Sequence, residues 1–180
     1  MGTNSLARLD FWLIDHVAQP VVDWCARTRG IGRKTLAVQT ALGGLVMTVA
    51  LTGFAVAERH IPTALMSAVA VMSALCSLFM ALFLWQAASM SDRPSPRAPV
   101  WRIMPARLPL LMAWICRDVV FYGAHALGRL PWAGDIRLHL ALSDAWMACV
   151  IAHLYIMGCR TTPPEVRRRV PAGAIHHGAA

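Results

Sequence analysis

Two long apolar runs decide the fold of this chain: LAVQTALGGLVMTVALTGFAVA at residues 36–57 and ALMSAVAVMSALCSLFMALFLWQAA at residues 64–88. Each run is at least as long as the roughly 20 residues that an α-helix needs to cross the hydrocarbon core of a bilayer. Because lipid offers the backbone no hydrogen-bond partners, such runs are stable in a membrane only as helices. The chain is therefore predicted to be an all-α integral membrane protein.

The composition points to the same class of protein. Hydrophobic residues make up 57% of the 180 residues and charged residues only 14%, far from the averages of soluble domains. The net charge of +8 would suggest nucleic acid as a partner of a soluble protein. Here the basic residues border the apolar runs, as in the cytoplasmic loops of membrane proteins. We expect the lipid bilayer and other membrane subunits as partners, and no nucleic acid.

Residues 1–35 are predicted to be a cytoplasmic juxtamembrane segment, in which residues 6–24 form an amphipathic helix broken near Pro20 and a basic stretch follows. Apolar residues recur every three or four positions, at Leu6, Leu9, Leu13, Val17, Val21 and Trp24. The basic residues that follow are Arg27, Arg29, Arg33 and Lys34, which we expect at an anionic membrane surface. The helix should lie on the cytoplasmic leaflet, or pack through the same stripe against the bundle or a partner subunit.

Small side chains recur at four-residue spacing in the first apolar run, at Thr40, Gly44, Thr48 and Thr52. Ser73 and Ser77 continue this pattern in the second run. Rows of small residues let two membrane helices approach closely. Residues 36–90 are therefore predicted to form a tight antiparallel hairpin, in which these residues pack the helices together.

A second hairpin is predicted at residues 108–158, with spans at 108–127 and 136–158. The linker at 91–107 is rich in Pro and Arg, and the tail at 159–180 is expected to be disordered, with Arg167, Arg168 and Arg169 near lipid headgroups. Basic residues favour the amino-terminal segment, the linker and the tail over the two outer turns. This asymmetry predicts four spans with both termini in the cytoplasm. Lys34 is the only lysine, and the wealth of Arg, Ala, Gly and Pro suggests a bacterial inner-membrane protein.

The second hairpin carries ionisable residues, which are costly in a bilayer unless they have buried partners. Asp118, Tyr122 and His125 share one helix face. If the hairpin turns near residue 131, Arg117 reaches the depth of Asp144, and we predict an ion pair between them. Asp118 is a poorer partner for Arg117, because neighbours in sequence do not face each other on a helix.

Three functions fit these residues. The first is a non-enzymatic accessory, scaffold or assembly subunit of a larger membrane complex, without a cofactor. The second is a redox subunit in which His125 and His139 bind haem or a metal ion. The third is a small oligomeric channel or transporter for protons or solute along the polar face. No phosphate loop, zinc-protease motif or hydrolase elbow occurs in the sequence, so an enzyme is not expected.

Overall fold

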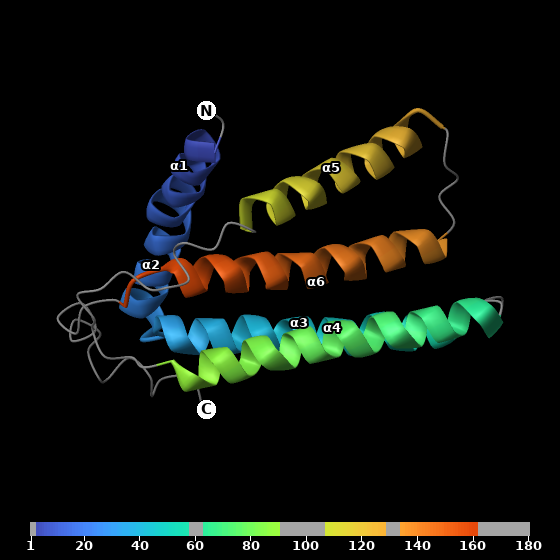
Figure 1. Ribbon diagram of the computed structural model, residues 1–180, viewed down its shortest axis with the longest axis horizontal. Helices are drawn as coiled ribbons and strands as arrows, with labels where there is room; N and C mark the ends of the chain where they lie inside the picture. The colour runs from blue at the N-terminus through green and yellow to red at the C-terminus, as the bar shows by residue number, and fades with distance from the viewer. Residues whose placement is uncertain (1–2, 58–62, 91–106, 129–133, 162–180) are drawn as a thin grey trace, which may run out of the picture.

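The computed structural model describes residues 3–57, 63–90, 107–128 and 134–161. Every regular element in these ranges is a helix, which confirms the all-helical class (Figure 1). In chain order the elements are α1 (Thr3–Leu13), the π-helical turn η1 (Ile14–Ala18), α2 (Gln19–Arg29), α3 (Arg33–Ala57), α4 (Thr63–Ser89), α5 (Arg107–Ala126) and α6 (Gly134–Gly158). The predicted turn after residue 57, most of the linker and the tail with Arg167, Arg168 and Arg169 lie outside the described residues.

Within the described ranges, three helices are long and apolar enough to cross a membrane: Arg33–Ala57 in α3, Ala70–Ser89 in α4 and Arg137–Gly158 in α6. The 25 residues of α3 form a rod about 37 Å long, which exceeds the roughly 30 Å of a hydrocarbon core. These helices identify a membrane protein. α5 is not among the three, because charged residues at its centre lower its hydropathy, so the predicted count of four spans is not reached on this criterion.

α3 is the central helix of the bundle. α4 and α6 both pack against α3 and run antiparallel to it (Figure 1). α5 runs antiparallel to α6 and diverges from it towards the C-terminal end of α5. The starts of α3 and α5 and the ends of α4 and α6 lie at the same end of the bundle, and α1 and α2 lie across this end.

The row of small residues in α3 faces both of its neighbours. A Cβ atom at Gly44 would overlap Met80 Sδ of α4 and lie 3.5 Å from Cys149 Cβ of α6. Thr48 Oγ1 accepts a hydrogen bond of 2.9 Å from Trp146 Nε1 of α6. From the sequence, this row was expected to pack against the second helix, and its contact with α6 was not predicted. Nothing local in the sequence marks α6, which follows about 100 residues later, as a partner of α3.

The other predicted packing residues have mixed surroundings. The hydroxyls of Thr40 and Thr52 donate to backbone carbonyls of α3 itself, and Thr40 Oγ1 also lies 3.4 Å from His153 Nδ1 of α6. In α4, Ser73 and Ser77 are both half-buried, and Ser73 lines a cavity shared with α3 and α6. The close contact therefore depends mainly on Gly44 and Thr48.

The amino-terminal helix continues from α1 through η1 into α2. Pro20 lies in the first turn of α2, directly after the π-helical turn. Proline lacks an amide proton and its ring clashes with the carbonyl four residues earlier, so a helix must widen or break there. The predicted break near Pro20 is thus a local widening of one turn. Gly30, with a φ of 65°, ends α2 and directs the chain into α3.

Two faces of the amino-terminal helix have different surroundings. Asp10, Ile14, Val22 and Ala26 repeat at multiples of four residues and are buried against the bundle. Most of the predicted apolar stripe is exposed: Leu6, Leu9, Val17, Val21 and Trp24, together with Trp12. Val17 and Val21 line a cavity together with Leu111 of α5 and Ile151 of α6, so this part of the stripe borders the bundle. The exposed remainder of the stripe is available to lipid or to another protein.

The four basic residues after the amphipathic stripe do not share one role. Arg27 and Arg29 are exposed, and Lys34 is half-buried. Arg33 is buried, and its Nη1 donates a hydrogen bond to the carbonyl oxygen of Cys159, directly after α6. Carbonyls at a helix C-terminus carry partial negative charge and attract cations. Arg33 therefore joins the start of α3 to the end of α6, a contact that the sequence analysis did not predict.

Candidate functional site

A group of polar side chains gathers at the middle of α5, on the side of α6. Arg117 is its centre: Nη1 donates to Ser143 Oγ at 2.7 Å, and Nη2 donates to Asp144 Oδ1. Arg117 also donates to Asp118 Oδ1, from Nε at 2.9 Å and from Nη2 at 2.7 Å. We call this group the Arg117 cluster, which consists of Trp114, Arg117, Asp118, Tyr122, Ser143 and Asp144.

Asp144 is the acceptor that joins α6 to α5. Besides Arg117, it accepts a hydrogen bond of 3.3 Å from Trp114 Nε1 and one of 3.1 Å from Tyr122 OH. These three donors cover more than two turns of α5. A single carboxylate on α6 thus fixes the register of α5 at this level.

The structure brings Arg117 and Asp144 together, as the spacing of the second hairpin led us to expect. Asp118 differs from the expectation, because it also binds Arg117. The Cβ atoms of neighbouring residues diverge on a helix, but the arginine side chain is long enough to fold back to the next residue. Tyr122 belongs to the same group through Asp144.

The Arg117 cluster is not sealed inside the protein. The side chains of Arg117, Asp118 and Asp144 keep 28%, 24% and 22% of their surface exposed. Large apolar side chains surround them on α5, including the exposed Ile115, Val119 and Val120. In a bilayer these charges would sit at the perimeter of the bundle, where lipid offers no polar contact.

The two histidines considered as haem or metal ligands belong to different surroundings. The ring of His139 lies against Phe54 of α3, with 6.2 Å between ring centroids. His125 lies near the end of α5, the part that diverges from α6 (Figure 1). Among the described residues, no three His, Cys, Asp or Glu side chains are grouped so that they could hold a metal ion.

His153 of α6 is a buried polar residue to which the sequence analysis gave no role. Its Nδ1 lies 3.0 Å from the carbonyl oxygen of Ala37, and its ring stacks on Phe83 of α4 with 4.4 Å between centroids. It therefore packs where α3, α4 and α6 meet. A histidine within an apolar span gives no sign in the sequence of which helices it contacts.

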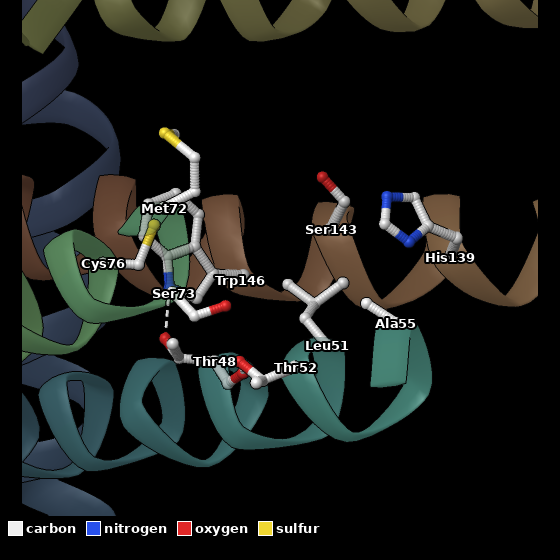
Figure 2. Close-up of a pocket in the computed structure, with 10 residues that line it drawn as sticks. All are labelled: Thr48, Leu51, Thr52, Ala55, Met72, Ser73, Cys76, His139, Ser143 and Trp146. Atoms are coloured by element: carbon white, nitrogen blue, oxygen red, sulfur yellow. Dashed lines mark hydrogen bonds between the residues drawn. The ribbon is translucent and has the colours of Figure 1, made fainter. Parts of the chain in front are cut away.

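A cavity of about 400 Å³ opens between α3, α4 and α6 (Figure 2). Its walls are mostly apolar, and Trp146, one of the lining residues, donates its hydrogen bond to Thr48 (Figure 2). The lining residues are Thr48, Leu51, Thr52, Ala55, Met72, Ser73, Cys76, His139, Ser143 and Trp146. Ser143 lines this cavity and also accepts a hydrogen bond from Arg117. It therefore belongs both to the cavity wall and to the Arg117 cluster.

A second ion pair lies at the end of the bundle. Arg107, the first residue of α5, donates from Nη2 to Asp10 Oδ2 of α1 at 2.7 Å. Its side chain is fully buried, and its guanidinium carbon lies 5.7 Å from the centre of the Tyr155 ring. From the sequence, Arg107 was expected in the linker at 91–107, and Asp10 had no predicted role. Their separation of 97 residues hides the pair from any local pattern.

Comparisons with known proteins find no matching family model, no similar curated protein and no similar solved structure. The geometry of the described residues is therefore the evidence on function. In that geometry the Arg117 cluster stands out, because it places charges at the edge of an apolar bundle.

Proposed function

We propose that this chain is a non-enzymatic accessory, scaffold or assembly subunit of a larger bacterial inner-membrane complex. In this proposal α5 is the docking helix, and both chain termini lie in the cytoplasm. The proposal rests on one observation: the partly exposed Arg117 cluster on the outermost helix of the bundle.

The energetic cost of ionisable groups in lipid supports a protein neighbour at this place. On insertion scales a charged side chain at the bilayer centre costs about 2.5–3.5 kcal/mol. Mutual pairing of Arg117 with Asp118 and Asp144 offsets part of this cost. The exposed remainder favours a protein surface that offers polar groups, since lipid tails offer none.

The loose packing of α5 supports the same role. α5 packs against α6 and touches α1, whereas α3 packs along both α4 and α6. Val119 and Val120, on the turn that follows Arg117, each keep 66% of their surface exposed. A helix that is held on one side and carries charges on its flank can receive another helix without rearranging the bundle.

The amino-terminal helix supports the proposed orientation. It lies across the end of the bundle and turns an apolar stripe outwards, as a helix at a membrane surface does (Figure 1). Arg27 and Arg29 are exposed at its end, where they can meet anionic headgroups. Because basic residues favour the cytoplasmic side, this end of the bundle is assigned to the cytoplasm.

Site-directed photocrosslinking in cells tests the proposal. A photoreactive residue at Val119 on α5 should form an adduct with a membrane partner. The same residue at Val46 on α3, which is 60% exposed, is the matched control and should give no such adduct. Gentle detergent extraction should bring down that partner in stoichiometric amount. A lone monomer without adducts at Val119 would refute the docking role.

A further inference from the structure

The Arg117 cluster carries one more negative than positive charge. Asp118 and Asp144 both pair with Arg117, which is the only basic residue of the cluster. Asp144 has three donors. Asp118 receives both of its hydrogen bonds on Oδ1, and no described residue donates to its Oδ2. The uncompensated charge of the cluster therefore lies on Asp118.

Asp118 can be reached from outside the bundle. It lies at the centre of α5, with 24% of its side chain exposed. Ile115 and Tyr122 lie three residues before it and four residues after it, so all three share one helix face. Both neighbours are exposed. Ile115 offers an apolar side chain on one side of the carboxylate, and Tyr122 offers the exposed part of its ring on the other side while its hydroxyl binds Asp144. A second helix can contact both side chains and the carboxylate between them.

We infer that the partner contributes a transmembrane helix with one Lys or Arg that pairs with Asp118; this inference rests on the docking role proposed above. Charge complementarity supports it, since one added cation makes the cluster neutral. The attraction between two charges is far stronger in a medium of low dielectric constant than in water. A basic residue in the partner helix would itself be costly in lipid, so each helix supplies the charge that the other lacks.

A defined synthetic helix tests this inference without knowledge of the natural partner. The full chain, with a donor fluorophore at its amino terminus, is reconstituted in liposomes. Acceptor-labelled Leu/Ala helices of about 20 residues carry either one central Lys or Leu at that position. Energy transfer should show the Lys helix binding about three- to tenfold more tightly than the Leu helix. A third helix with a central Glu should bind no better than the Leu helix.

The Asp118→Asn variant should remove the advantage of the Lys helix, because an amide keeps the shape of the side chain but not its charge. Asp15→Asn, an exposed carboxylate on η1, is the matched control and should retain the advantage. Circular dichroism checks that each variant remains helical. The comparison of the Lys and Leu helices on the unaltered chain tests the inference even if a variant fails to fold.

Two results would overturn the inference: a Lys helix that binds no better than the Leu helix, or an advantage that persists in Asp118→Asn. If the Val119 adduct still forms in cells in either case, the docking role stands and only the assignment of the cation to Asp118 falls. If the Val119 adduct is also absent, both proposals fail.

Discussion

At the scale of single residues, Asp144 has the greatest influence on how α5 is held. Its carboxylate is the common acceptor for Arg117, Trp114 and Tyr122, which come from separate turns of α5. Hydrogen bonds to a charged acceptor are each worth roughly 1.5–3 kcal/mol when buried, and less when water can replace them. Because these donors have one acceptor in common, losing it affects all of them together.

We therefore predict that Asp144→Asn lowers the free energy of unfolding by about 1–3 kcal/mol. The amide of asparagine has one acceptor oxygen and one NH2 group, so at least one of the donors on α5 would face another donor instead of an acceptor. Unfolding by SDS titration in mixed micelles measures the change. Thr35→Ala, at an exposed position in the first turn of α3, should change stability by less than about 0.5 kcal/mol. Equal stability of the two variants would contradict the role given to Asp144.

Two glycines of α3 provide a matched test of helix packing. A Cβ at Gly44 would overlap Met80 Sδ, whereas nothing lies within 4 Å of a Cβ at Gly53. Gly44→Leu should therefore push α3 away from α4 and α6 and cost about 1–3 kcal/mol, a usual range for overpacking. Gly53→Leu should leave stability unchanged or raise it slightly, because leucine favours a helix more than glycine does. Thermal unfolding in detergent compares the two variants, and a similar loss in both would rule out close packing at Gly44.

At the scale of helices, the sequence predicts where elements lie better than what they contact. α3, α4 and α6 begin and end within a few residues of the apolar runs, because the membrane imposes length and composition on each span separately. Contacts between helices depend on side chains far apart in sequence. No local sequence pattern therefore predicts the pairing of Asp10 with Arg107, the burial of Arg33 or the packing of α6 on Gly44. Arg117 and Asp144 were paired only because a short turn fixes their relative depth.

The ion pair between Asp10 and Arg107 should hold the amino-terminal helix on the bundle. Arg107 is fully buried, and breaking a buried pair from one side typically costs about 3–5 kcal/mol. We expect Asp10→Ala to loosen α1 and α2, so that trypsin cleaves after Arg8 faster than in the unaltered chain. Thr35→Ala, at an exposed position in the first turn of α3, should leave the cleavage rate unchanged.

The exchange variant Asp10→Arg with Arg107→Asp separates the ion pair from other effects of these residues. It should recover part of the protection, because the charges are again opposite. Equally fast cleavage of the single and double variants would show that the pair does not hold the helix.

At the scale of the whole molecule, the directions of the helices constrain how the chain crosses a membrane. α4 and α6 both run antiparallel to α3, so α4 ends at one end of the bundle and α6 begins at the other (Figure 1). If both are spans, the chain between them must cross the bilayer as well. α5 is the helix that runs in the required direction. Its modest hydropathy reflects the charges of Arg117 and Asp118, which pair with each other and with Asp144.

If α5 crosses the bilayer, four single-cysteine positions in a cysteine-free background should be accessible to a labelling reagent from defined sides of the membrane. Ser89→Cys and Arg160→Cys should react with a membrane-impermeant maleimide only after the cytoplasmic side is opened, because both lie at the end of the bundle that carries α1 and α2. Thr63→Cys and Gly134→Cys, at the other end, should react in spheroplasts with an intact inner membrane. If Gly134→Cys reacted only from the cytoplasmic side, α5 would not cross the bilayer. The Arg117 cluster would then lie outside the hydrocarbon core, and the energetic argument for a docked partner helix would no longer apply.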